Sequence, residues 1–158
     1  MISGTTLSAL RALVLLGQQS PAVIPPRRIA EELGESPTYL SKVTTLLVKA
    51  GILHAEKGVK GGVRLARPPA DVTMLAVVEA CQGAVVGAYC QSVCRPSQIC
   101  AFHQAAQQLE TAICETLERW TLEQLLRKPA RVQSLAGGFA CVMLPPGQTT
   151  ALSTIAEP

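Results

Sequence analysis

The chain has 158 residues, 48 % of them hydrophobic but only 3 % aromatic, and a formal net charge of +3. This length fits one domain, or a compact domain with an appended helical module. A core built from Leu, Val and Ala favours helices over a β-sandwich, which would use more aromatic and β-branched residues. The chain contains no apolar run of about 18 residues, so no transmembrane helix is expected. Residues 7–17 lack the basic start that a signal peptide has. We therefore expect a cytoplasmic protein with no membrane partner.

The charge is distributed unevenly along the chain. Residues 1–70 contain nine basic and four acidic side chains, whereas residues 71–158 contain five basic and seven acidic ones. A basic first half indicates a nucleic-acid-binding surface in that half.

Three helices are predicted in the first fifty residues. Leucines at three- and four-residue spacing predict a helix over 7–17, and a short second helix is predicted over 27–33. Gly34 ends the second helix, while Ser36 is a good N-cap for a third helix over 37–50. A short helix, a three-residue turn and another helix form the helix-turn-helix arrangement.

A hairpin is predicted directly after the third helix. Residues 52–56 and 63–66 have the pattern of two strands, and the glycine-rich turn between them carries lysines. A hairpin after a helix-turn-helix makes a winged helix, whose second helix enters the major groove while the wing reaches phosphates or the minor groove. Glycines permit close backbone approach there. The candidate phosphate contacts are Arg28, Lys42, Lys49, Lys57, Lys60 and Arg64.

The second half is predicted to consist of a helix over 72–82, a cysteine-bearing loop and a long helix over 102–126. The apolar positions of the long helix are close to a heptad seam: Phe102, Ala106, Leu109, Ile113, Leu117 and Trp120. Because the chain has no other long helix, the simplest partner is the same helix of a second copy, giving a homodimer. The alternative is that the seam packs back onto the winged helix.

The expected fold is mainly α with a small β-hairpin. It consists of a winged helix-turn-helix domain over 1–70, a connecting helix, loop and dimerisation helix over 71–128, and a largely irregular tail over 129–158.

Cys90, Cys94, Cys100 and His103 have the spacing C-x3-C-x5-C-x2-H. Thiols stay reduced in the cytosol, so such a cluster indicates metal binding or redox chemistry. Ligand sets rich in thiolates suit zinc, copper(I) or iron–sulfur clusters, and three Cys with one His complete a tetrahedral zinc shell. A reversible Cys90–Cys94 disulfide without metal is a further alternative. We expect no enzyme, because the chain has no evident acid–base pair and no phosphate-binding glycine loop after a strand.

Several segments carry a specific resemblance: SPTYLSKV, LVKAGIL, the GxxGG turn and RLARPPADVT. Together they make the chain similar to the Rrf-two family of bacterial winged-helix regulators, which includes IscR, NsrR and RirA, over about residues 7–127. The resemblance implies a transcription regulator, with repression as the expected mode. It would bind a double-stranded DNA operator as a homodimer through helix 102–126. It also implies an iron–sulfur cluster, of the 2Fe–2S type, that senses iron, redox or nitric oxide status and is held by three cysteines before the long helix.

The resemblance assigns roles residue by residue. The start of the family's recognition helix is matched by Ser36, Thr38, Tyr39, Ser41 and Lys42. Lys57 stands at the wing position where IscR-like proteins use an arginine, and Gly61 and Gly62 match the wing glycines. The ligand pattern is matched in its second half by Cys94, Cys100 and His103. The spacing from Cys90 to Cys94 is shorter than in cluster-binding relatives, so Cys90 is the ligand that departs from the family.

Overall fold

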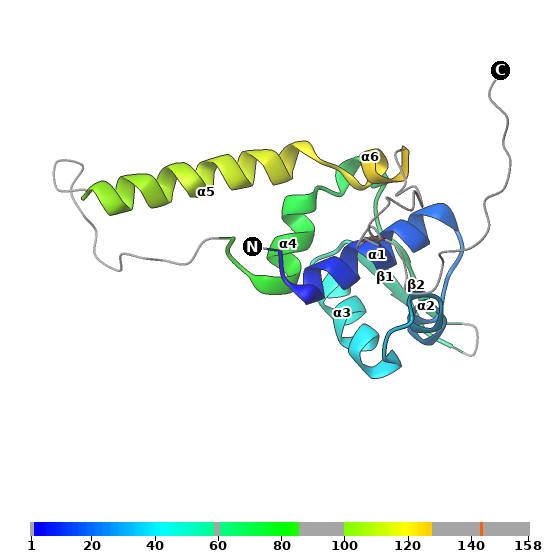
Figure 1. The fold of residues 1–158 in the computed structure, drawn as a ribbon. Coiled ribbons are helices and arrows are strands. Elements are labelled where there is room, and N and C mark those ends of the chain that lie inside the picture. Colours follow the sequence, from blue (N-terminus) through cyan, green and yellow to red (C-terminus); the bar gives the residue numbers. More distant parts are fainter. Residues whose placement is uncertain (1, 59–60, 86–99, 128–142, 144–158) are drawn as a thin grey trace, which may run out of the picture.

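The computed structural model describes residues 2–58, 61–85, 100–127 and 143. Figure 1 shows a compact group of helices with a small hairpin, from which one long helix projects. Its elements are α1 (Gly4–Gln18), α2 (Pro26–Leu33), α3 (Pro37–Lys49), β1 (Leu53–Glu56), β2 (Gly62–Leu65), the 3-10 turn η1 (Pro69–Asp71), α4 (Met74–Gln82), α5 (Ala101–Arg119) and α6 (Leu122–Arg127).

The helix-turn-helix has the local ends that the sequence predicts. Gly34 ends α2 in the left-handed conformation with φ 66°, a backbone angle that favours glycine. Two residues later the Ser36 side chain accepts a hydrogen bond from the backbone N–H of Tyr39, and Pro37 occupies the first position of α3. These signals end α2 and start α3 on either side of a short turn.

The wing is an antiparallel pair in which Leu53 faces Leu65 and Glu56 faces Gly62. Ile24 adds a bridge on the other side of β2, since its backbone exchanges hydrogen bonds of 3.0 and 2.9 Å with Val63. A Cβ atom on Gly62 would collide with the backbone of Ile24. Gly62 is the first residue of β2, and its lack of a side chain permits this close backbone packing.

The core is formed by leucine, isoleucine and valine side chains from the helices and the hairpin. Its fully buried members include Leu13, Leu16, Ile29, Leu40, Val43, Leu47, Ile52, Val72 and Val77. Aliphatic side chains packed between the helices thus form this core almost without aromatic residues. The one described residue of the predicted tail, Met143, packs against this core.

The prediction of a single helix over residues 102–126 is wrong. Arg119 is the last residue of α5, Trp120 is extended with φ −94° and ψ 122°, and α6 begins at Leu122. The seam through Trp120 therefore ends at the break and does not continue along one straight helix.

The break has a tertiary cause. The backbone N–H of Met74 donates to the carbonyl of Trp120 at 2.8 Å, and that of Leu122 donates to the carbonyl of Val72 at 2.8 Å. Thr73 and Thr121 form an antiparallel bridge at the same place. The carbonyl of Trp120 and the N–H of Leu122 thus find their partners at the start of α4 and just before it, instead of within a continuous helix.

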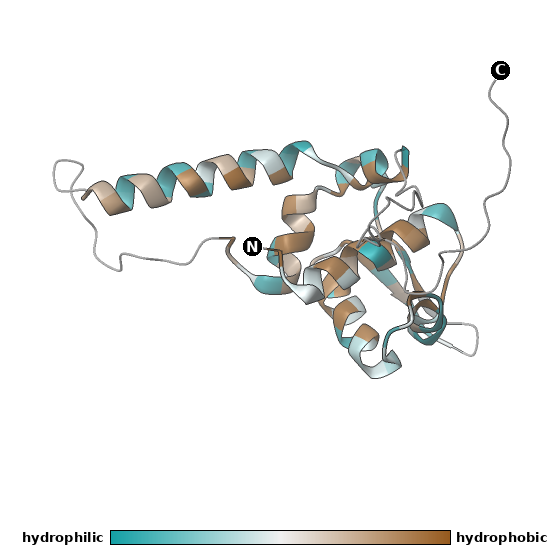
Figure 2. Ribbon diagram, in the orientation of Figure 1, coloured by the Kyte–Doolittle hydropathy of each residue, from teal (hydrophilic) through white to brown (hydrophobic). Residues whose placement is uncertain are grey.

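α5 packs against α4 on one side only. None of its side chains is buried, and Figure 2 shows apolar residues recurring along it among polar ones. Phe102 and Leu109 are 64 % and 58 % exposed, whereas Ile113 and Leu117 are half-buried beside α4. The seam is therefore divided between a part that contacts the same chain and a part that faces outward. Among the described helices, none is long and apolar enough to cross a membrane.

Candidate nucleic-acid interface and metal ligands

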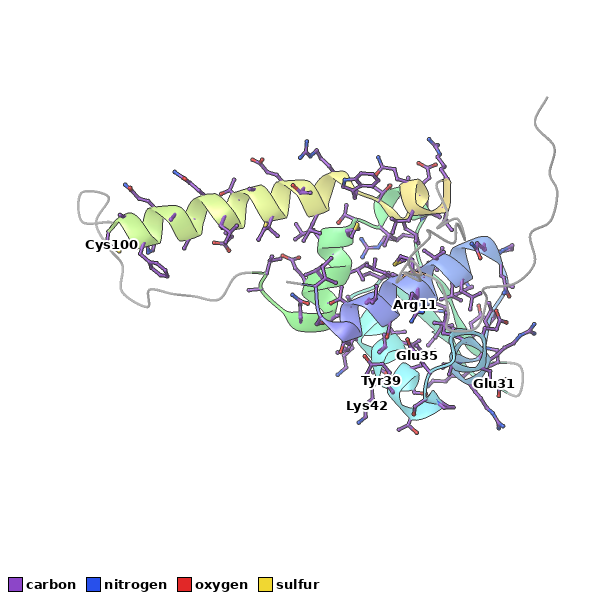
Figure 3. The ribbon with its side chains drawn as sticks, viewed as in Figure 1. Arg11, Glu31, Glu35, Tyr39, Lys42 and Cys100 are labelled. Carbon is purple, nitrogen blue, oxygen red and sulfur yellow. The ribbon has the colours of Figure 1, made fainter. Side chains whose placement is uncertain are left out.

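The N-terminal half of α3 presents a polar face to the outside of the molecule. Leu40 and Val43 are buried, and the positions around them are exposed. The exposed set contains the sequence-predicted residues Ser36, Thr38, Tyr39, Ser41 and Lys42. Figure 3 shows Tyr39 and Lys42 extending from the same end of the molecule. The structure thus brings all five onto one accessible helix end.

The basic candidates differ in their partners within the protein. Arg28 pairs with Glu32 at 3.2 Å, and Arg64 pairs with Glu56 across the wing at 2.7 Å. The exposed Lys42, Lys49 and Lys57 form no ion pair with any residue that the structure describes. Among the described basic candidates, these three lysines thus carry the least compensated charges. Lys60 lies outside the described residues, and Gly61 directly precedes β2.

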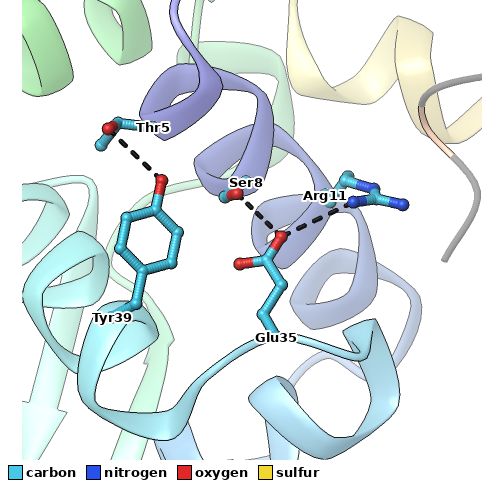
Figure 4. Close-up of polar contacts among 5 residues, drawn as sticks. All are labelled: Thr5, Ser8, Arg11, Glu35 and Tyr39. Carbon is cyan, nitrogen blue, oxygen red and sulfur yellow. Dashed lines mark hydrogen bonds and ion pairs between the residues drawn. The ribbon is translucent and has the colours of Figure 1, made fainter. Parts of the chain in front are cut away.

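A carboxylate that the sequence did not single out joins α1 to the turn before α3. Oε1 of Glu35 accepts a hydrogen bond from the Ser8 hydroxyl at 2.7 Å and lies 3.5 Å from Nη1 of Arg11 (Figure 4). The Arg11 and Glu35 side chains are only 13 % and 14 % exposed, so this pair is shielded from solvent more than the surface pairs on α2. The contact positions the helix-turn-helix against α1.

A second contact joins α1 to the first turn of α3 itself. The Tyr39 hydroxyl donates to Oγ1 of Thr5 at 3.3 Å (Figure 4), and the residue as a whole is 36 % exposed. Tyr39 thus contacts α1 while part of the residue remains accessible. Sequence reasoning missed Thr5 and Glu35, because nothing in their local sequence indicates which distant side chain they meet.

Two of the four candidate metal ligands lie in the described part of the chain. Cys100 is the exposed N-cap of α5, and its Sγ accepts the backbone N–H of His103 at 3.4 Å. His103 is half-buried in the first turn of the same helix. Cys90 and Cys94 lie outside the described residues, and within those residues no group of three or more potential ligands is gathered.

The surroundings of Cys100 suit a metal-bound thiolate. A sulfur at a helix N-terminus receives a backbone N–H and the positive end of the helix dipole, both of which favour negative charge. The two described donors, one sulfur and one imidazole, belong to the ligand types found in zinc and iron–sulfur sites. These residues therefore fit either group.

Cys81 has a different environment. It lies on α4, packs against the hydrophobic core, and burial raises the pKa of its thiol above the ordinary value. A raised pKa keeps the thiol protonated and makes it a poor nucleophile. This agrees with its interpretation as a small core residue.

The chain is similar to known proteins over most of its length. A family model for Rrf2, described as an iron-dependent transcriptional regulator, matches residues 2–128. The regulator NsrR of Halalkalibacterium halodurans is 29 % identical over 132 residues, covering 80 % of this chain and 90 % of that protein. The regulator IscR of Vibrio campbellii is 28 % identical over 123 residues, covering 77 % and 72 %.

Solved structures agree on the fold. CymR of Bacillus subtilis superposes with a TM-score of 0.66 over 81 % of this chain and 97 % of that one, at 21 % identity. The predicted winged-helix fold is confirmed by this likeness together with the helices and hairpin described above. Since the family model spans most of the chain, the protein belongs to the Rrf2 family of DNA-binding transcriptional regulators.

Proposed function

We propose that this regulator represses transcription as a cytoplasmic homodimer that recognises a specific DNA operator, and that an iron–sulfur cluster modulates its binding. The observation that carries the DNA-binding part is the exposed polar end of α3, held beside the wing and tied to α1. Such an element inserts into the major groove, where its first residues reach base edges and phosphates.

The roles on DNA follow from exposure and chemistry. Thr38, Tyr39 and Ser41 offer hydroxyl groups at the start of α3, and Lys42 offers a cation beside them. Lys57 directly follows β1, and Lys60 belongs to the same predicted turn by its sequence position; from this turn a cation reaches phosphates or the adjacent minor groove. Arg28 and Arg64 would exchange their carboxylate partners for phosphates, so their contribution is smaller.

Dimerisation is supported by the outward face of α5. Phe102 and Leu109 are more than half exposed, and Trp120 at the end of the helix is 44 % exposed. Apolar side chains that recur on one helix face favour a partner helix, and a two-fold symmetric pair supplies the same face twice. Two recognition helices in one dimer would read two half-sites.

The cluster is proposed to be held by Cys90, Cys94 and Cys100, with His103 as the fourth ligand, and to be of the 2Fe–2S type. Support comes from the exposed Cys100 at the start of α5, from the iron named in the family description, and from the similarity to NsrR and IscR. When bound, such a cluster supplies an inorganic centre that responds to iron supply, oxidants and nitric oxide. Zinc at the same ligands, or a Cys90–Cys94 thiol switch without metal, is the alternative.

Anaerobic purification of the full chain, followed by iron, sulfide and zinc analysis and an absorption spectrum, tests the cofactor. Iron and sulfide in equal amounts with a visible absorption band support the proposal. Replacing Cys90 or Cys100 with Ala should remove both, whereas Cys114→Ala, a half-buried cysteine on α5, should retain them. One zinc per chain without sulfide would favour the structural-zinc alternative, and absence of any metal would favour the thiol switch.

DNA recognition is tested separately with duplexes selected from a random-sequence library by the purified chain. Enrichment of a two-fold symmetric sequence supports a dimeric, specific reader. Binding of all duplexes with equal affinity would contradict specificity, whatever the metal content.

A further inference from the structure

Gln82, the last residue of α4, holds the first turn of α1. Its Oε1 atom accepts the backbone N–H of Ser3 at 3.1 Å and the hydroxyl of Thr6 at 3.0 Å. Ser3 is itself the N-cap of α1, and Thr6 is fully buried. One side-chain oxygen of Gln82 therefore anchors the N-terminus of a helix that is 76 to 79 positions away in the sequence.

Gln82 stands where the chain leaves α4 for the cysteine-bearing segment. Gly83 ends α4 with φ 76° and ψ −150°, and its N–H still donates to the carbonyl of Glu79 at 3.0 Å. Cys90, the first candidate ligand, follows only a few residues later. A displacement of the chain after Gly83 would thus act first on the Gln82 side chain.

The surroundings of this junction leave room for rearrangement. A partly open apolar cavity of about 450 Å³ lies between α4 and α5, and its walls include Ile2, Gln82 and Val85 together with Ile113 and Leu117 of α5. Figure 1 accordingly places the N-terminus beside α4. The elements α4, α5 and the start of α1 are therefore not densely packed against one another at this point.

From this junction α1 leads to the recognition helix. Thr5 lies between Ser3 and Thr6 in the first turn and accepts the hydroxyl of Tyr39 on α3. One turn later Ser8 and Arg11 contact Glu35, just before α3 begins (Figure 4). Since α1 is a 15-residue helix packed into the core, a movement of its first turn as part of the whole helix would reach both contacts.

We propose that Gln82 is a positioning residue that couples the end of α4 to the orientation of α3, through the first turn of α1. The regulatory use of this coupling rests on the proposed function, because it supplies the route by which the cysteine-bearing segment would change DNA binding. The coupling itself is a property of the fold and is testable without a metal.

Amide hydrogen exchange of the metal-free chain tests the coupling. Gln82→Met removes the acceptor at similar size, so exchange should rise roughly tenfold over residues 3–9 and also over 36–42, with α2 unchanged. Gln82→Glu keeps an acceptor oxygen and should restore the wild-type pattern. Gln18→Met, the same change at an exposed position at the other end of α1, is the control. Unchanged exchange over 36–42 in Gln82→Met would overturn the inference.

The regulatory use is tested by measuring DNA affinity with and without metal, on a duplex obtained by selection. The metal response is the ratio of these two affinities. If the wild-type ratio lies in the usual range of about 5- to 150-fold, Gln82→Met should reduce it to roughly twofold or less while metal content stays at the wild-type level. Thr5→Val should do the same, and the double variant should lose nothing further, because both residues act in one connection. A Gln82→Met variant that keeps the full response would overturn the coupling. A wild-type chain without any response would instead refute the cluster-dependent function, and the exchange experiment would still decide the coupling.

Discussion

Arg11 on α1 lies 3.5 Å from Glu35 in the turn before α3, and both side chains are largely shielded from solvent. Glu35→Gln keeps the size of the side chain and an acceptor for Ser8 but leaves the Arg11 charge without this carboxylate. We expect a loss of about 1–3 kcal/mol in the free energy of unfolding, measured by denaturant titration. Glu31→Gln removes an exposed pair with Arg27 and should cost less than about 0.5 kcal/mol. Equal losses in the two variants would contradict the buried role of Glu35.

Gly62, like Gly61 beside it, is a position of the wing where a side chain has no space. Gly62→Ala places a Cβ atom against the backbone of Ile24, so we expect a destabilisation of about 1–3 kcal/mol by thermal or denaturant unfolding. Gly4→Ala is the matched control, because a Cβ there meets no atom within 4 Å. In the first turn of α1 this control should leave stability unchanged or raise it by up to about 1 kcal/mol.

Lys42 and Lys57 should each contribute one phosphate contact. Substitution of either by Ala is expected to weaken binding to all duplexes and to reduce the slope of log K against log salt by about one unit. Arg127→Ala on α6, which Figure 1 shows on the side of α1 away from α3, should leave the slope unchanged. A lysine variant with an unaltered slope would remove that residue from the interface.

Leu109 is the exposed apolar residue that most directly tests dimerisation. Leu109→Glu should raise the dimer dissociation constant by two orders of magnitude, or about 3 kcal/mol, since the contact is lost on both copies. Light scattering coupled to gel filtration measures the change. Thr111→Glu, an exposed position on a different face of α5, should leave the dimer intact. A dimer that survives Leu109→Glu would assign the interface to another surface.

Cys81 and Cys100 should differ in reactivity. In the folded, metal-free chain at neutral pH, iodoacetamide should modify the exposed Cys100 well before Cys81, because burial both shields Cys81 and raises its pKa. Mass mapping of the modified peptides measures this order, and the difference should vanish in denaturant.

The same pKa shift has a defined effect on stability. Because the folded-state pKa of Cys81 is above the unfolded value, its contribution to stability is complete below the unfolded value and is lost as the pH rises through the folded one. The expected result is lower stability in alkaline solution, and Cys81→Ala should weaken this pH dependence.

Local signals in the sequence were sufficient to predict the helix-turn-helix and the wing. Ser36 and Pro37 start α3, Gly34 ends α2, and alternating residues around a glycine-rich turn form the hairpin; each of these depends only on neighbours in the chain. The exposed polar end of α3 followed from the same helical periodicity. The spacing of the cysteines predicted a metal site, which stays a prediction.

Tertiary contacts decided what local patterns could not. Heptad spacing favoured one helix through Trp120, but residues 120–122 bond to the segment before α4, and this distant pairing breaks the helix. The side chains of Thr121 and Gln124 then cap the start of α6, each accepting the backbone N–H of the other. This pair acts as a cap only because the helix is broken before it.

The polar contacts that hold α1 to the rest of the protein also depend on the tertiary structure. Glu35, Thr5 and Gln82 are ordinary polar residues in sequence, and their partners are 24 to 79 positions away. Sequence by itself therefore determined which segments form the winged-helix unit, because helix ends and turns are local chemistry. Only the tertiary structure decided how that unit is held to α1 and α4, because hydrogen bonds between distant side chains exist only after the core has brought them together.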